Sequence, residues 1–347
     1  MLISILSFVV VFTIIALAHE FGHLIWAKRA GIRVFEFGIG FGPRLYAFSK
    51  NNTTYSLNLI PILAFVRIAG EGESEEDLTC PEEESYLSKT PLQKFKALAA
   101  GPFMNILAAL LILILLFLFA GAPSGVSNII GSVNKNSPAE KAGLKVGDKL
   151  LAINGKPYEK MEEAITVIHK SADKSLTLSI QREGKKLLFR ATPKYNQKMK
   201  VALLGFAPQP IYKRVNPLVA VYLAFQQTAS MIAMTLLIIW QLLTGAAAVT
   251  DLAGPIGIAQ ITGRYAQTGI VSLMWLTAFI NVNIGVLNLL PIPALDGGHI
   301  VFIIIQAIRK KPIDPKLENK IHMWGMVALL CLMAVVSVGD LLRIFKR

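Results

Sequence analysis

Four apolar runs, each long enough to cross a membrane, constrain the fold of this chain more than any other feature. The runs cover residues 2–27, 97–122, 269–290 and about 323–339. A helix needs roughly 20 apolar residues to cross the hydrocarbon layer, and only helices and closed barrels satisfy their own peptide groups there. The sequence therefore predicts a polytopic α-helical membrane protein with about four transmembrane helices.

Composition agrees with a membrane protein. The 347 residues are 54% hydrophobic and 16% charged, and the mean hydropathy of +0.54 is too high for an ordinary soluble enzyme. The net charge of +13 would indicate nucleic-acid binding in a soluble domain. Many basic residues instead flank the apolar runs, where they meet anionic lipid: Lys28, Arg29, Lys94, Lys96, Arg309, Lys310 and Lys311. We therefore expect the lipid bilayer and not nucleic acid as a partner.

Residues 126–195 have a different character, because charged residues recur between short alternating strands such as "SLTLSIQREGKKLLFRATP". We interpret this stretch as a small water-soluble domain inserted into the membrane protein. Its segment "SPAEKAGLKVGDKLLAINGKP" resembles a bacterial PDZ domain, which is an α+β fold. The resemblance implies that the domain binds an extended peptide by adding a strand to a sheet edge.

A fifth apolar run, residues 217–249, follows this domain and carries Gln226, Gln227 and Gln241. We expect the chain to divide into four parts. These are a first part of the membrane core (1–125), the PDZ domain (126–195), a membrane-associated helical segment (196–268) and a second part of the core (269–347).

The first apolar run contains "AHEFGHL", residues 18–24. Ionisable side chains inside a membrane span are costly and mark a functional site. On a helix, His19 and His23 project from one face a turn apart, so both rings can reach one Zn²⁺, while Glu20 lies about 100° around the helix. This spacing predicts two zinc ligands and a general base. A proton relay or ion pathway in a transporter is the alternative use of such residues.

A third ligand has to come from histidine or a carboxylate. The two cysteines, Cys80 and Cys331, supply neither a disulfide framework nor a cysteine metal site. The segment "NLLPIPALDGGHI", residues 288–300, offers Asp296 and His299 at the end of the third run. Zinc chemistry leaves both open.

These motifs together resemble the site-2 protease family of intramembrane zinc metalloproteases, in its bacterial PDZ-containing branch of regulator-of-sigma-E proteases. The matching residues are His19-Glu20-Phe21-Gly22-His23, Gly101-Pro102-Phe103-Met104-Asn105, and Asn288, Pro291, Pro293 and Leu295-Asp296-Gly297. The resemblance implies a zinc endopeptidase that cuts membrane proteins within or next to their transmembrane segments. Substrates of this kind include anti-sigma factors and signal-peptide remnants, cut in regulated intramembrane proteolysis.

The resemblance also implies roles for single residues. Asp296 becomes the third ligand of one zinc ion per chain, and His299 lies outside the ligand set. We expect the ion to acidify a water whose proton Glu20 accepts and later returns to the leaving amine. Asn288 corresponds to a substrate-binding asparagine, although it is equally a helix-packing amide. Asn105 is expected to support the site from behind the ligands.

Residues 44–61 predict two strands around a Lys-Asn-Asn-Thr turn. The resemblance implies that this hairpin re-enters the membrane beside the zinc, and a plain cytoplasmic hairpin is the alternative. We expect its free edge to hold an unwound substrate segment, with Tyr55, Leu57 and Leu59 as binding residues. The family pattern Pro-Leu-Gly-Gly-Tyr-Val-Lys is replaced here by "PILAFVR", residues 61–67, which has no glycine. A second departure is the single PDZ domain, because some relatives carry two.

Topology follows from the positions of the ligands. If Lys28 and Arg29 lie in the cytoplasm, the second run returns outward and exports the PDZ domain. Asp296 must reach the depth of His19, so the third run also has to enter from outside. A crossing by residues 217–249 would reverse that direction, so we expect this run to lie on the outer face. The resemblance implies a bacterial inner-membrane protein with an extracytoplasmic PDZ domain.

Two other functions would use the same features. One is a zinc or proton transporter, and the other is a non-catalytic membrane scaffold that presents its PDZ domain. The intact Glu20 and the distant Leu-Asp-Gly motif favour the protease. We assign no catalytic function to His169 or His322, and we expect the acidic residues 71–86 to form a solvated cytoplasmic loop.

Overall fold

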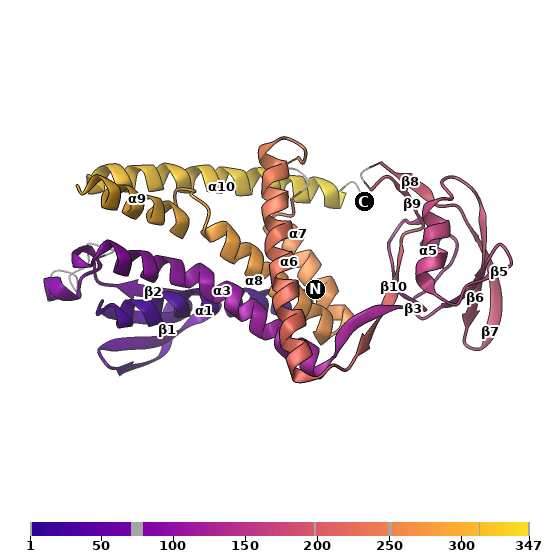
Figure 1. The fold of residues 1–347 in the computed structure, drawn as a ribbon, viewed down its shortest axis with the longest axis horizontal. Coiled ribbons are helices and arrows are strands. Elements are labelled where there is room, and N and C mark those ends of the chain that lie inside the picture. The colour runs from indigo at the N-terminus through magenta and orange to yellow at the C-terminus, as the bar shows by residue number, and fades with distance from the viewer. Residues whose placement is uncertain (1, 71–78, 198, 249–251, 312, 346–347) are drawn as a thin grey trace. The chain divides into compact units, whose positions relative to one another are not determined.

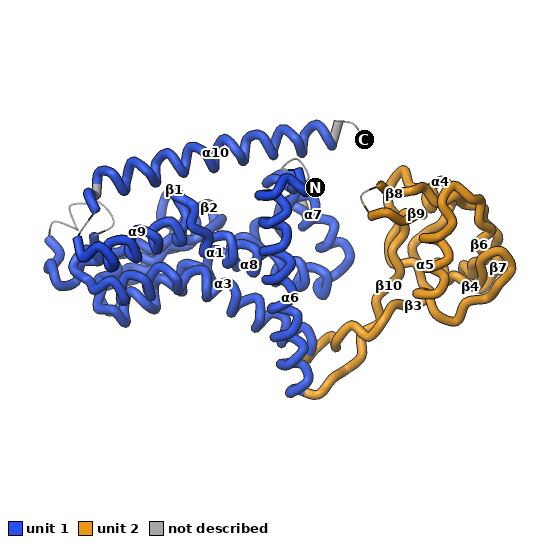
Figure 2. Tube along the Cα trace, turned by 45° about the horizontal axis from the view of Figure 1, so that its top comes forward, with its two compact units in different colours: residues 1–117, 217–347 blue, residues 118–216 orange. Residues whose placement is uncertain are grey.

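The computed structural model describes residues 2–70, 79–197, 199–248, 252–311 and 313–345. The chain forms two compact units, one of residues 1–117 and 217–347 and the other of residues 118–216 (Figure 2). Of the acidic stretch 71–86, residues 71–78 lie outside the description. The remainder contains the short helix η1 (Glu82–Glu84), where Glu84 pairs with Arg33 at 3.2 Å.

Among the described residues, five helices of the first unit are long and apolar enough to cross a membrane (Figure 1). They are α1 (Leu2–Arg29), α3 (Pro91–Phe119), α6 (Pro217–Leu243), α8 (Ile270–Asn288) and α10 (Pro315–Phe345). Two shorter helices, α7 (Pro255–Thr268) and α9 (Asp296–Arg309), complete the unit. Most of each of the four predicted membrane runs is therefore helical, and so are residues 217–243 of the fifth apolar run.

Helix α6 packs through one stripe of small and medium side chains, namely Ala220, Ala224, Thr228, Met231 and Thr235. The Thr235 hydroxyl donates to the Asn283 side chain on α8 at 3.1 Å, which ties the two helices together. Figures 1 and 2 both show α6 running across the direction of α3 and α10. Length and composition alone would make α6 a membrane span, whereas its direction differs from that of its neighbours.

The predicted hairpin is present and longer than residues 44–61, because β1 covers Val34–Lys50 and β2 covers Thr53–Ile68. Asn51 and Asn52 turn the chain with positive φ angles of 51° and 57°, as a two-residue hairpin turn requires. Both strands bend. Residues 36–39 pair with 54–57 along one edge and with 64–67 along the other, while residues 44–50 pair with 53–58. The segment around residue 55 is therefore enclosed on both edges.

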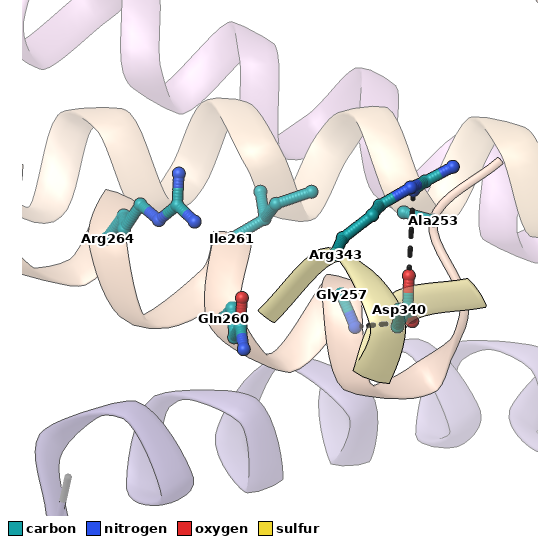
Figure 3. Close-up of a pocket in the computed structure, with 7 residues that line it drawn as sticks. All are labelled: Ala253, Gly257, Gln260, Ile261, Arg264, Asp340 and Arg343. Atoms are coloured by element: carbon teal, nitrogen blue, oxygen red, sulfur yellow. Dashed lines mark hydrogen bonds and ion pairs between the residues drawn. The ribbon is translucent and has the colours of Figure 1, made fainter. Parts of the chain in front are cut away.

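Helix α7 receives its N-terminal cap from the far end of the chain. Its own cap residue, Gly254, has no side chain to accept a hydrogen bond, and the Gly257 N–H donates instead to Asp340 Oδ2 on α10 at 2.7 Å (Figure 3). Asp340 is buried and lies 3.7 Å from Arg343. On its other side α7 packs against α1 and α8, around the apolar residues Val11, Ile15, Leu276 and Ile280.

The second unit is a small sheet with helices. Its strands run in the order β10-β3-β4-β6-β7, with β5 paired to β4 and a separate β8-β9 pair. The strands are β3 (Ala122–Val133), β4 (Lys149–Ile153), β5 (Lys156–Pro157), β6 (Leu176–Arg182), β7 (Lys185–Ala191), β8 (Lys194–Asn196), β9 (Val201–Leu203) and β10 (Phe206–Lys213). The helices are α4 (Pro138–Lys141) and α5 (Met161–His169).

This unit extends beyond the expected range of 126–195. Strand β3 begins at Ala122, and β10 pairs along it as far as Lys213. Residues 201–203 and 206–213 are thus strands, whereas the sequence reading placed them in a helical segment. The paired residues of β3 and β10 are 73 to 91 positions apart, so their pairing gives no local signal in the sequence.

Candidate metal centre

Two histidines of α1 and one aspartate of α9 converge in the first unit. The Nε2 atoms of His19 and His23 lie 3.2 Å apart. Oδ2 of Asp296, the first residue of α9, lies 3.2 Å from Nε2 of His19 and 3.7 Å from Nε2 of His23. The three side chains are only 13–16% exposed. The residues predicted as zinc ligands therefore meet, although they come from opposite ends of the sequence.

Glycines make this close approach possible. A Cβ atom on Gly101 of α3 would overlap the rings of His19 and His23, and one on Gly22 of α1 would overlap the backbone of Ala100. The backbone of α3 therefore lies directly against the histidine face of α1. Gly297 has the same function beside the third ligand, because a Cβ there would overlap the backbone at residues 289–290.

Neighbouring groups on α3 orient both rings. Nδ1 of His23 lies 2.8 Å from the Ala97 carbonyl, so it donates its proton there and leaves a lone pair on Nε2. Nδ1 of His19 lies 3.3 Å from Nδ2 of the fully buried Asn105 side chain, and Oδ1 of Asn105 has no hydrogen-bond partner among the described residues. Turning the amide over exchanges these two atoms, and Oδ1 can then accept a proton from Nδ1 and leave the Nε2 lone pair of His19 facing the cluster.

This donor set fits a zinc ion. Three electron-rich atoms face one another, and Oδ2 of Asp296 is buried without a hydrogen bond. Ligands about 2.0–2.1 Å from a tetrahedral zinc lie about 3.3 Å from one another, close to the separations of 3.2, 3.2 and 3.7 Å. Two imidazoles and one carboxylate leave the fourth position open, which is the arrangement of catalytic zinc sites.

Glu20 follows the first ligand on α1 and contacts the hairpin. Its Oε2 accepts a hydrogen bond from the backbone N–H of Val66 on β2 at 3.1 Å. Because that N–H points to Glu20 and not into the hairpin, residues 64–67 present their outer edge to the site. The expected base and a strand edge therefore lie side by side.

The hairpin residues proposed from the sequence need a correction. The backbone of Tyr55 is paired with both Phe37 and Phe48, and that of Leu57 with both Ile39 and Tyr46. Neither residue can accept a further strand. Leu59 is exposed but lies in the same segment of β2, before the bend that leads to residues 64–67. The prediction ended the second strand at residue 61, although the apolar pattern continues to Ile68.

The remaining candidates lie outside the ligand cluster. Asn288 ends α8 half-buried, and its side chain makes no hydrogen bond within the described part of the chain. Asn281 donates to the Thr277 carbonyl on the same helix, which is a packing role. Nδ1 of His299 lies 3.7 Å from Glu318, and the cluster of His19, His23 and Asp296 does not include it.

Comparison with known proteins agrees with this geometry. The family model for peptidase family M50 matches residues 7–332. The chain belongs to peptidase family M50. A zinc metalloprotease RasP of Bacillus licheniformis is 31% identical over 99% of both chains. The regulator of sigma-W protease RasP of Bacillus subtilis is also 31% identical, again over 99% of both chains. The RasP zinc metalloprotease of Geobacillus kaustophilus is 33% identical, over 99% of this chain and 98% of the relative.

Membership of family M50 confirms the predicted class of protein. The chain is an integral membrane protein and an intramembrane zinc metalloprotease, and Zn²⁺ is its cofactor. The transporter and scaffold alternatives are not favoured.

Two solved structures are similar to part of the chain. The PDZ domain of an SdrC-like protein from Listeria monocytogenes is 20% identical, covering 25% of this chain and 90% of that one, with a TM-score of 0.22. Its counterpart from Listeria innocua is 21% identical, covering 26% and 100%, with the same TM-score. Overlap at this level does not establish the fold of the second unit, so the PDZ assignment rests on the motif in residues 126–195.

Proposed function

We propose that this protein cleaves other membrane proteins within or next to their transmembrane segments, with zinc held by His19, His23 and Asp296 and with Glu20 as the general base. One observation carries the assignment, which is the convergence of two imidazole Nε2 atoms and a buried carboxylate oxygen from α1 and α9. Ordinary packing does not bring three lone-pair donors together without a proton or a cation between them.

The residues around the metal have separate tasks. Zinc in this position supplies Lewis-acid polarisation of a carbonyl and lowers the pKa of a water. Glu20 accepts the proton of the attacking water and passes it to the leaving amine. The Ala97 carbonyl keeps His23 in the tautomer that presents Nε2, and the Asn105 side chain holds the His19 ring from behind.

The substrate has to be unwound before it can be cut, because a helix encloses its peptide bonds in its own hydrogen bonds. Residues 64–67 offer an outer strand edge next to Glu20, so we place the substrate strand there. Asn288 keeps its proposed role in holding the substrate backbone, supported by an amide without a partner in the described chain. Tyr55 and Leu57 lie instead in the central segment of the hairpin, where the backbone is paired on both edges.

Re-entry of the hairpin into the membrane is supported by its surface. Four large apolar side chains around the bend of β1 are exposed, namely Phe41, Leu45, Tyr46 and Phe48. Exposed apolar surface of this kind suits hydrocarbon better than water. Except along its two outer edges, the hairpin pairs its own backbone N–H and C=O groups, as a membrane environment demands.

For the whole chain we propose four crossing helices, α1, α3, α8 and α10, with α6 lying along the outer face. The support is that α6 runs across the direction of α3 and α10 (Figure 1), and that Asp296 meets His19. The PDZ unit then faces outward from a bacterial inner membrane. It either binds an exposed peptide end or excludes substrates with bulky outer domains, and we favour exclusion because this works without a specific end sequence.

A comparison of two membrane proteomes tests the proposal. Cells with the unaltered protein are compared with cells that carry Glu20→Gln, which should bind zinc normally but cannot accept the proton of water. Full-length substrates, including anti-sigma factors and signal-peptide remnants, should accumulate with the variant. Unchanged proteomes together with normal peptide turnover by Glu20→Gln would contradict the assigned base.

A further inference from the structure

The last helix contacts the loop that leads into the third zinc ligand. The backbone N–H of Ala294 donates to Nδ1 of His322 on α10 at 2.9 Å, and His322 is only 9% exposed. One turn further along, a Cβ on Gly325 would overlap Pro293. Helix α10 therefore lies directly on the segment between α8 and α9, two residues before Asp296.

Ala294 has an unusual backbone conformation. Its φ angle is +76°, in the left-handed region that residues with a Cβ rarely adopt. Such a conformation persists where the surroundings hold it, and it is often found beside functional sites. The contact that the structure gives to the Ala294 amide is the His322 ring.

The ring of His322 is in turn held by α9. His299 stacks on it with ring centroids 3.6 Å apart and planes 9° from parallel. Nδ1 of His299 lies 3.7 Å from Glu318, and Glu318 also accepts from Gln306 at 3.4 Å. The stack therefore joins α9 and α10 at the point where the ligand loop meets them.

Proximity alone would make His299, Glu318 and His322 a second metal site, because their donor atoms lie within 4.8 Å of one another. The geometry excludes this. An imidazole binds a metal in the plane of its ring, and two nearly parallel stacked rings cannot both point at one ion. In addition, Nδ1 of His322 accepts the Ala294 proton, so a neutral His322 carries its own proton on Nε2.

We propose that His322 is a positioning residue for the zinc site. By accepting from Ala294 it fixes the left-handed turn that directs Asp296 toward His19 and His23, while the stacked His299 keeps the ring in place. The inference rests on the proposed ligand role of Asp296. Helix α10 is thus connected to the loop before Asp296 by the hydrogen bond from Ala294 to His322, and to α9 by the stacking of His299 on that ring.

The first test uses two substitutions at the same position in the full-length protein. His322→Leu removes the acceptor and fills its place with an apolar side chain. His322→Asn instead places an oxygen acceptor near the position of Nδ1. Loss of an indirect support of this kind weakens metal binding by roughly 10–100-fold. We expect a loss of this size for His322→Leu when zinc affinity is measured in competition with a chelator. His322→Asn should bind zinc nearly as well as the unaltered protein. Met323→Leu, an exposed neighbour on α10, is the matched control.

A second measurement does not depend on zinc or on activity. Hydrogen exchange of peptides covering residues 291–298, recorded after chelation, reports the Ala294 amide directly. Exchange at this amide should be about tenfold faster in His322→Leu, as the loss of one hydrogen bond predicts. Peptides from α10 should exchange at unchanged rates, which would exclude general unfolding.

The decisive variant combines His322→Leu with Ala294→Gly. Glycine adopts a positive φ without a Cβ clash, so the turn no longer needs the ring to hold it. Zinc affinity should recover in the double variant, while the amide at residue 294 remains unprotected. Failure to recover, or equal zinc loss in His322→Asn and His322→Leu, would overturn the positioning role. If Asp296→Ala itself kept zinc, the ligand assignment would fail, which is a different result from either of these.

Discussion

The backbone N–H of Val66 donates to the carboxylate of Glu20 at 3.1 Å, so a strand edge and the expected catalytic base share one hydrogen bond. This contact places the hairpin against α1 at the residue where proton transfer is expected. A substrate strand laid along residues 64–67 would bring its carbonyls next to Glu20 and the metal ligands. Unwinding of the substrate and hydrolysis are thereby located at one place.

Replacement of the third ligand should separate Asp296 from its neighbour His299. Asp296→Ala should lower zinc content and abolish cleavage, because it removes the carboxylate oxygen that faces both histidines. His299→Ala should leave zinc near one ion per chain, since its ring lies outside the cluster. Metal analysis of the purified variants measures both. Equal zinc loss in the two variants would contradict the ligand set.

Gly101→Ala should disrupt the metal site without altering any ligand. The added Cβ would overlap the facing atoms of His19 and His23, so the rings or α3 have to move apart. We expect zinc affinity to fall by at least about tenfold, comparable to the loss of a supporting residue. Gly339→Ala on α10 is the control, because nothing lies within 4 Å of its added Cβ. Metal titration should distinguish the two, and normal zinc binding by Gly101→Ala would show that the histidines have room.

Leu63→Gly should be tolerated although it removes a large side chain. Leu63 has a φ of +68°, a conformation that costs about 1–2 kcal/mol for a residue with a Cβ. Glycine removes this cost and loses some chain entropy, so the free energy of unfolding should change by less than about 1 kcal/mol. Ala64→Gly, in the segment paired with Ile39, should destabilise the protein by about 0.5–1 kcal/mol. Denaturant unfolding of the solubilised protein compares them, and a larger loss for Leu63→Gly would reverse the expectation.

The second unit should lose stability in acid through Asp148. Burial alone would raise the pKa of Asp148. Hydrogen bonds from the Arg182 side chain and the Lys145 backbone N–H, together with the positive charges of the Arg182 and Lys145 side chains, outweigh burial and lower that pKa. Because the pKa of Asp148 is lower in the folded state, its ionised form stabilises the unit above the unfolded pKa of about 3.9. This stabilisation is lost as the pH falls through the pKa of the folded state. Exchange of peptides from residues 118–216, corrected for intrinsic rates, should therefore accelerate below about pH 4. Asp148→Asn should weaken this dependence, and an identical acid response would exclude Asp148 as its source.

Labelling of single cysteines tests the proposed topology. After Cys80 and Cys331 are replaced by serine, a cysteine at Asn136 should react with an impermeant thiol reagent added to intact cells. A cysteine at Lys316, at the start of α10, should react only after the membrane is opened. Both positions are exposed in the structure, so burial would not prevent labelling. Equal labelling at the two sites would mean that an even number of helices crosses the membrane between them, whereas the proposal has only α8 crossing there.

Local patterns predicted the helices and the shared face of the two histidines, because both depend on short-range spacing, whereas Asp296 was expected only from the resemblance. The four membrane runs became helices, and the four-residue spacing of His19 and His23 placed both rings on one face of α1. The free edge of the hairpin was beyond such reasoning, since it depends on how β1 and β2 bend and which segments then enclose Tyr55. The contact between His322 and Ala294 had no sequence signal either, because it arises when α10 packs on a loop made by other helices.

The cap that Asp340 gives to α7 affects how the protein is made. Helix α10 follows α7 in the chain, so the Gly257 N–H lacks its Asp340 acceptor until α10 has been synthesised and has reached α7. Helix α7 also packs against the first half of α1 around Val11 and Ile15, so the part of the unit that surrounds these residues depends on a helix that is synthesised later. The order of synthesis therefore delays the final packing of α7 on the helix that carries the two histidines.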